Sequence, residues 1–174
     1  EAKEQEQVQQ ANVLDSIAMK RLNELKVLLV EDNEFNRMVA EDTMKELMPD
    51  ITIHMAFDGQ EAVNQLQKEM YDIVLMDIQM PVMDGMTATK AIRRLPEPAK
   101  SVKIIAMTAN VMQEDVQEYF NIGMNAYVAK PFNADELLLK MDKVMGNNRP
   151  VSAKQATTPE PPPVKKEKVF PPLP

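Results

Sequence analysis

The sequence alternates between short apolar runs and longer segments in which apolar side chains recur at helical spacing. The five short runs have the length and continuous apolar character of strands buried on both faces; they are residues 26–30, 51–56, 73–76, 104–107 and 126–129. Helical spacing follows each run, at residues 33–47, 59–68, 87–94, 113–122 and 133–145. Five such units predict an α/β fold in which helices cover both faces of a parallel sheet.

Right-handed crossovers between parallel strands leave few ways to wind five units of this kind. The commonest open arrangement has the strand order 2-1-3-4-5, so we expect a doubly wound, flavodoxin-like (βα)5 sheet. The chain has 174 residues, which suits one domain with extensions better than several domains. We place this domain at residues 26–146.

The two ends of the chain differ from the alternating middle. Leu14, Ala18, Leu22 and Leu25 recur at helical spacing, so residues 1–25 are expected to be a linker that contains a short amphipathic helix. Such a helix fits either the end of a signalling helix or a frayed linker. Residues 147–174 are rich in proline and lysine and lack apolar periodicity, which predicts a disordered tail too short to fold as an output domain.

Composition excludes several kinds of chemistry. The chain has no cysteine and one histidine, which rules out disulfides, thiolate metal sites and clusters of metal-binding histidines. Its net charge of -7 disfavours direct binding of nucleic acid, whose phosphates attract lysine and arginine. No apolar run approaches the roughly 18 residues that span a membrane, and the polar start does not resemble a secretory signal. We therefore expect a cytoplasmic domain that contacts neither nucleic acid nor membrane.

Polar side chains follow four of the predicted strands. Glu31 and Asp32 come after the first strand, Asp77 after the third, Thr108 after the fourth and Lys130 after the fifth. In an open α/β sheet, ligands bind beyond the carboxyl ends of the strands, where the winding direction reverses. For the order 2-1-3-4-5 that point lies between the first and third strands. The three carboxylates should therefore lie side by side, with the hydroxyl and the ammonium on the adjoining strands.

This set of side chains suits a metal ion and a phosphoryl group. Neighbouring carboxylates repel one another and raise a pKa unless a cation lies between them, and an all-oxygen site favours Mg²⁺, with Mn²⁺ as the alternative. Lys130 and Thr108 add a positive charge and a hydroxyl donor for phosphoryl oxygens. Asp77 stands alone at the end of the central apolar run, so it is the candidate nucleophile, and its product would be an aspartyl phosphate.

Four stretches together resemble the receiver domain of two-component response regulators: VEDN at 30–33, MDIQMPVMDG at 76–85, MTAN at 107–110 and KPF at 130–132. The resemblance covers about residues 26–146, and VEDNEFNR and MDIQMP are most similar to receivers of hybrid sensor histidine kinases. It implies a phosphoacceptor domain of a phosphorelay, limited to self-catalysed phosphotransfer and autodephosphorylation. The chain would then be free-standing or a fragment of a hybrid kinase, including the cytoplasmic part of a membrane-associated one.

The resemblance also implies roles at the metal site. Asp77 would accept the phosphoryl group, and Asp32, Asp77 and the backbone carbonyl of Gln79 would ligate Mg²⁺. Glu31 would reach the metal through water. Gln79 and Asn110, two residues after the acceptor and the threonine, would modulate the water that removes the phosphoryl group.

The implied switch involves the last two strands. Lys130, expected to form a cis peptide bond with Pro131, would pair with the phosphoryl oxygens. Thr108 would move to donate a hydrogen bond to them, and the ring of Tyr127 would swing inward after it. The implied output surface is about residues 111–145.

The implied phosphoryl donor is a histidine kinase or a histidine phosphotransfer domain, since His54, the one histidine, lies in a predicted strand. The donor would dock on the rim of the site, formed by Asn33, Phe35, Asn36, Pro131 and Phe132. A monomer is expected.

Two other classes of function are weighed against this one. A pseudo-receiver would use the same fold as an unphosphorylated docking or scaffold domain, although all five expected site residues are present. A phosphatase of the haloacid dehalogenase type would also use an aspartyl nucleophile. That family places a second aspartate two residues after the nucleophile, where this chain has Gln79.

Overall fold

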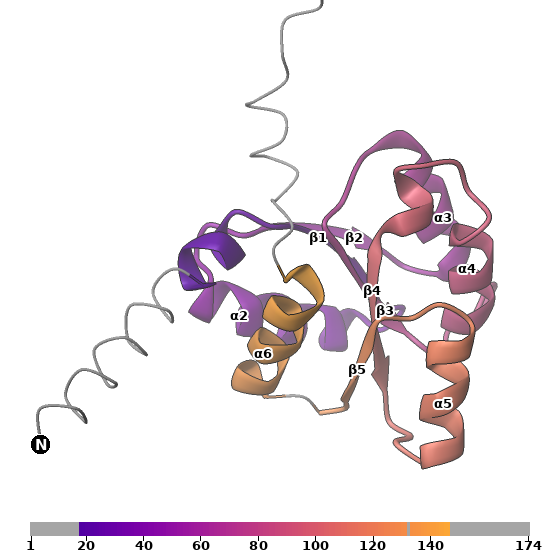
Figure 1. The fold of residues 1–174 in the computed structure, drawn as a ribbon. Helices are drawn as coiled ribbons and strands as arrows, with labels where there is room; N and C mark the ends of the chain where they lie inside the picture. Colours follow the sequence, from indigo (N-terminus) through magenta and orange to yellow (C-terminus); the bar gives the residue numbers. More distant parts are fainter. Residues whose placement is uncertain (1–17, 132, 147–174) are drawn as a thin grey trace, which may run out of the picture.

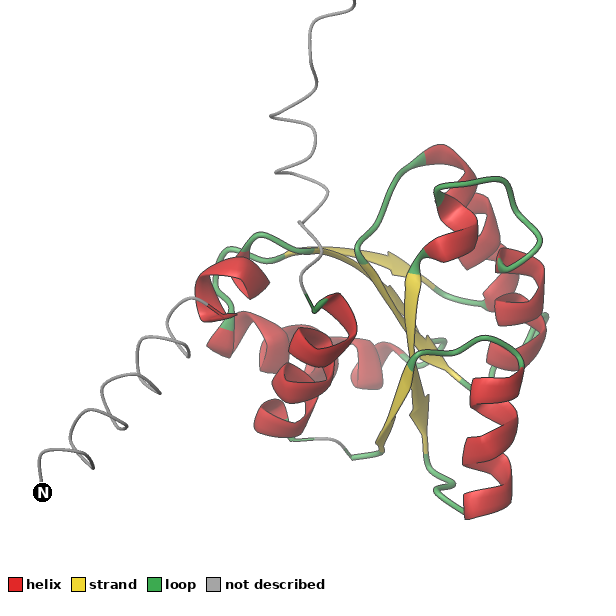
Figure 2. Cartoon of the chain, in the orientation of Figure 1, coloured by secondary structure: helices red, strands yellow, loops and turns green. Residues whose placement is uncertain are grey.

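The computed structural model describes residues 18–131 and 133–146 (Figure 1). They form a five-stranded parallel sheet of order β2-β1-β3-β4-β5 with helices on both faces (Figure 2). The strands are β1 (Lys26–Val30), β2 (Thr52–Ala56), β3 (Ile73–Asp77), β4 (Lys103–Thr108) and β5 (Ala126–Ala129). The helices are α2 (Glu34–Leu47), α3 (Gly59–Lys68), α4 (Gly85–Ile92), α5 (Gln113–Asn121) and α6 (Ala134–Met145), with a 3-10 turn at Ala99–Ser101. The predicted fold class and strand order are confirmed.

Helix α4 differs from the predicted segment 87–94. It begins at Gly85, because the side chain of Asp84 accepts a hydrogen bond from the backbone N–H of Thr87 at 2.7 Å and caps the helix. It ends at Ile92, after which the chain continues in turns. Asparagine or aspartate side chains cap α2, α3 and α6 in the same way. All four caps lie in loops that follow strand ends, and so help to fix the loops at the carboxyl edge of the sheet.

The sheet separates two apolar cores. Val27 and Leu29 face α2 and α6, whereas Leu28 and Val30 face α3, α4 and α5. All four side chains are fully buried. Burial on both faces explains why this strand is a continuous apolar run without alternation.

The segment before β1 packs against the core that lies between the sheet and helices α2 and α6. Residues 18–23 are helical, and Leu22 and Leu25 are buried there. The Arg21 guanidinium donates to the carbonyl of Gly146 at 3.2 Å and lies 3.9 Å from Asp142 of α6. The first and last described turns therefore meet at the amino edge of the sheet. The predicted helix residue Leu14 and the predicted tail at 147–174 lie outside the described residues.

Arg93 joins the end of α4 to two loops. Its guanidinium donates to the carbonyls of Gly123, Lys100 and Val102 at 2.6 to 2.9 Å. It also donates to the side chain of Asn125 at 3.0 Å. These bonds tie the end of α4 to the loops before β4 and β5.

Within residues 18–131 and 133–146, no helix is long and apolar enough to cross a bilayer.

Candidate metal and phosphoryl site

The five side chains predicted to converge lie at the carboxyl edge of the sheet. Glu31, Asp77 and Thr108 are buried, whereas Asp32 is exposed. A cavity of about 430 Å³ opens beside them. The residues that line it include Glu31, Asp32, Asn33, Asn36, Asp77, Gln79, Thr108, Asn110, Asp115, Tyr119 and Lys130.

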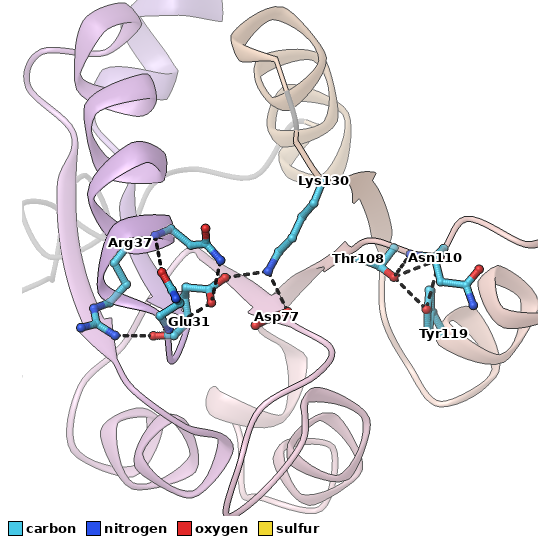
Figure 3. Close-up of polar contacts among 9 residues, drawn as sticks. Glu31, Arg37, Asp77, Thr108, Asn110, Tyr119 and Lys130 are labelled. Carbon is cyan, nitrogen blue, oxygen red and sulfur yellow. Dashed lines mark hydrogen bonds and ion pairs between the residues drawn. The ribbon is translucent and has the colours of Figure 1, made fainter.

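Lys130 bridges two of the carboxylates. Its Nζ lies 2.7 Å from Glu31 Oε2 and 2.9 Å from Asp77 Oδ1 (Figure 3). The Lys130 N–H donates to the carbonyl of Thr108 at 2.7 Å, which fixes the backbone at this position. The Lys130–Pro131 peptide bond is cis. The cis bond implied by the family resemblance is thus present. One ammonium group therefore forms ion pairs with two buried acids.

The two acids respond differently to this shared cation. Burial raises the pKa of Asp77 to about 6, with Lys130 opposing the shift and the charge of Glu31 adding to it. Burial also disfavours charge on Glu31, but Lys130 and the backbone N–H of Asn33 outweigh it and hold the pKa of Glu31 below its ordinary value. Both acids in turn raise the pKa of Lys130 against the effect of burial. At neutral pH the two acids therefore carry more negative charge than the one ammonium neutralises.

The donor set fits a hard divalent cation. One carboxylate oxygen from each of Glu31, Asp32 and Asp77 lies within 4.8 Å of the others. Oxygen ligands and uncompensated negative charge are the conditions under which Mg²⁺ and Mn²⁺ bind. Gln79, in the loop after β3, lines the same cavity. The sequence-predicted metal cluster is therefore assembled in the fold.

The loop after Asp77 is packed tightly against the strand. A Cβ atom on Gly85 would lie 2.1 Å from the carbonyl oxygen of Asp77, so only glycine fits this position. The Gly85 N–H donates to the carbonyl of Ile78 at 3.0 Å. Val82, at the tip of this loop, is 85% exposed and has a φ of 65°, in the left-handed region that disfavours β-branched residues.

Thr108 lies at the predicted edge, but its hydroxyl turns away from Asp77 (Figure 3). Its Oγ1 donates to the carbonyl of Asn110 at 2.9 Å, and the Asn110 N–H donates back at 2.9 Å. The hydroxyl of Tyr119, on α5, lies 3.1 Å from the same Oγ1. The Asn110 side chain donates to Asp115 at 2.6 Å. The threonine and its loop are thus bound to α5.

Tyr119 was not predicted as a site residue. Nothing in the sequence of segment 113–122 distinguishes Tyr119 from a residue that only packs in the core. Tyr127, which was predicted, is half-buried and lies between two other side chains. Its ring meets that of Phe120 edge-on at 6.4 Å, and Lys140 Nζ lies 4.7 Å from its centre.

The predicted docking rim borders a second cavity, of about 380 Å³. Phe35, Asn36 and Pro131 are among the residues that line it, and Phe35 is 65% exposed. Asn33 lines the neighbouring cavity beside Asp77. Phe132 lies outside the described residues.

Arg37 is a second residue that sequence reasoning missed. Its guanidinium donates to the backbone carbonyls of Glu31 and Asp32 at 2.8 and 2.9 Å and lies 4.2 Å from the centre of the Phe57 ring. It therefore holds the acidic turn after β1. A long cation that binds backbone carbonyls leaves no pattern in the sequence.

Comparisons with known proteins agree with this geometry. The family model of the response regulator receiver domain matches residues 27–142. Hybrid signal transduction histidine kinase G of Dictyostelium discoideum is 39% identical over 114 residues, which cover 66% of this chain and 3% of that protein. Histidine kinase 5 of Arabidopsis thaliana is 35% identical over 144 residues, which cover 68% of this chain and 15% of that protein. The chain therefore spans a small part of these relatives' length.

Solved structures match over the same region. The receiver domain of a sensor histidine kinase from Pseudomonas aeruginosa, with a magnesium ion coordinated in its active-site cleft, has a TM-score of 0.64 and 39% identity, covering 70% of this chain and 98% of that one. A second match is a co-crystal structure from Saccharomyces cerevisiae that contains a histidine phosphotransfer protein and the receiver domain of a response regulator. The matched chain has a TM-score of 0.61 and 31% identity, and the match covers 70% of this chain and 90% of that one. With its sheet order and acidic cluster, the chain belongs to the family of response regulator receiver domains, related to those of hybrid histidine kinases.

Proposed function

We propose that this domain accepts a phosphoryl group on Asp77 from a phosphohistidine and signals or relays it by a change of conformation. The observation that carries the proposal is the setting of Asp77, which is 5% exposed, lies 2.9 Å from Lys130 and belongs to a cluster of three acids. A buried acid with excess negative charge gains most from a divalent cation and is poised to act as a nucleophile once the cation is bound.

The transfer follows from this arrangement. A carboxylate oxygen of Asp77 attacks phosphorus, the P–N bond to the donor imidazole breaks, and its electron pair returns to the ring nitrogen. Asp32, Asp77 and the backbone carbonyl of Gln79, with Glu31 through water, would hold Mg²⁺ or Mn²⁺, which would supply positive charge to offset the phosphoryl oxygens. Lys130 stays beside the acceptor and pairs with one of those oxygens.

The conformational response would start at Thr108. A phosphoryl group on Asp77 offers new acceptor oxygens, and only a conformer that turns the Thr108 hydroxyl toward them gains that hydrogen bond. Tyr127 would then leave its contact with Lys140 and move inward. The affected surface is α5, β5 and α6, about residues 111–145, which we propose as the output surface.

The phosphoryl donor would be a histidine kinase or a histidine phosphotransfer domain. The cavity that Phe35, Asn36 and Pro131 help to line lies directly beside Lys130 and is the proposed docking surface, together with Asn33 and Phe132. The yeast complex of a phosphotransfer protein with a receiver domain supports this kind of partner. Gln79 and Asn110 are proposed to modulate loss of the phosphoryl group to water.

The proposal is tested by phosphorylation with acetyl phosphate and Mg²⁺, followed by intact-mass measurement. The wild-type chain should gain one phosphoryl group, and Asp77→Asn should gain none. Asp42→Asn is the matched control, because Asp42 is an exposed aspartate on α2 and should leave labelling unchanged. Labelling that persists in Asp77→Asn would refute the proposal. An unlabelled wild-type chain would favour an unphosphorylated docking domain.

A further inference from the structure

The hydroxyl of Thr108 is already hydrogen-bonded to three other groups in this conformer. A threonine hydroxyl has one proton and two acceptor lone pairs. The proton goes to the carbonyl of Asn110 at 2.9 Å, and the Asn110 N–H occupies one lone pair at 2.9 Å. The Tyr119 hydroxyl lies 3.1 Å from the same Oγ1, and either of the two oxygens can be the donor in this hydrogen bond. Before Thr108 can turn toward Asp77, these bonds have to break.

Tyr119 is placed to control this step from inside the protein. It is 4% exposed, lies on α5, and lines the same cavity as Asp77. Its hydroxyl also lies 3.4 Å from the carbonyl of Asn110, so it contacts both ends of the Thr108–Asn110 pair. Figure 3 shows this group separated from the group of Glu31, Lys130 and Asp77.

We propose that Tyr119 is a positioning residue whose hydroxyl holds Thr108 in the resting conformer, a contact we call the Tyr119 latch. The inference rests on the proposed function, since it concerns the switch that phosphorylation of Asp77 drives. The hydroxyl does not touch the metal cluster or the reacting atoms. It acts by stabilising the conformer in which Thr108 faces α5.

The latch has a measurable energetic consequence. An interaction present only in the resting conformer lowers the population of the switched one, and a ligand that requires the switched conformer binds more weakly by the same factor. One ordinary hydrogen bond corresponds to roughly a two- to ten-fold change in such a population. Tyr119→Phe removes the hydroxyl and keeps the buried ring. The affinity for a phosphoryl analogue should therefore rise by about two- to ten-fold.

The experiment titrates the 174-residue chain with beryllofluoride in the presence of Mg²⁺ and follows backbone amide signals by NMR. The dissociation constant should fall in Tyr119→Phe, whereas the affinity for Mg²⁺ alone should stay unchanged. Tyr71→Phe is the matched control, because the Tyr71 hydroxyl is also bonded, to His54 and Gln65, but lies before β3 at the opposite edge of the sheet. Tyr71→Phe should bind beryllofluoride as the wild type does.

A double-mutant cycle separates the latch from general packing. In the Thr108→Val background the partner hydroxyl is gone, so adding Tyr119→Phe should have no further effect on beryllofluoride affinity. An equal effect of Tyr119→Phe in both backgrounds, or an unchanged or weaker affinity of the single variant, would overturn the latch and leave the proposed function standing. A wild-type chain that does not bind beryllofluoride would overturn the proposed function and the latch with it.

Discussion

Without a divalent cation, neutralising Asp77 should stabilise the fold. Burial raises the pKa of Asp77 from its ordinary value of 3.8 to about 6. At roughly 1.4 kcal/mol for each pH unit, the charged acid lowers the free energy of unfolding by about 3 kcal/mol at neutral pH. Asp77→Asn removes this charge and leaves Lys130 paired with Glu31 at 2.7 Å. For a domain of this size, 3 kcal/mol corresponds to a rise in Tm of about 10 °C.

The sign of the pH dependence follows from the same shift. A folded-state pKa above the unfolded value means that the contribution of Asp77 to stability is fully present below about pH 4 and is lost as the pH rises through about 6. The advantage of Asp77→Asn should therefore be large at pH 7 and small at pH 4. Mg²⁺ should stabilise the wild type by mass action and narrow the gap, since the variant lacks one of the proposed ligands.

The assay is urea unfolding followed by circular dichroism at pH 4 and pH 7, first with EDTA and then with Mg²⁺. Asp42→Asn, at an exposed position on α2, should match the wild type under each condition. A variant Asp77→Asn that is less stable than the wild type at pH 7 in EDTA would refute the reasoning. So would an advantage of the same size at both pH values.

Three further changes test the fold around the site. Val82→Gly should raise the free energy of unfolding by about 0.5 to 1 kcal/mol, because glycine accepts the φ of 65°; a loss of stability in urea unfolding would contradict this. Gly85→Ala places a Cβ 2.1 Å from the Asp77 carbonyl oxygen and should cost about 3 kcal/mol or more, with Mg²⁺ affinity falling in calorimetry. Arg93→Ala should lower the free energy of unfolding by about 2 to 4 kcal/mol, and Arg93→Lys should restore only part of this loss. Full stability of the lysine variant would show that the planar guanidinium is not needed.

Sequence alone predicted the sheet order and the residues of the acidic cluster for a physical reason. Parallel strands end at one edge, so Glu31, Asp32 and Asp77 had to meet wherever the strand order placed β1 beside β3. The contacts of Lys130 with both acids do not follow from strand adjacency, because β4 lies between β5 and β3. Their consequence for the pKa of Asp77 depends on burial that only the fold supplies.

The orientation of single side chains could not be predicted in this way. The Thr108 hydroxyl turns toward α5 because Tyr119 and the Asn110 backbone bind it there, and these contacts depend on packing between a helix and a loop. Arg37 and Arg93 bind backbone carbonyls, which have no signature in the chain. The start of α4 at Gly85 could have been found, because Asp84 is a standard capping residue.

The contact between Arg21 and Gly146 bears on how such a domain can be carried by a longer polypeptide. Arg21 and Gly146 lie together at the amino edge of the sheet, whereas Asp77 ends β3 and the exposed Phe35 lies in the first turn of α2, at the opposite edge. Covalent neighbours attached at both points would therefore leave the approach to Asp77 open. Insertion of the whole domain into a surface loop of a host protein would need the host to span only a short gap.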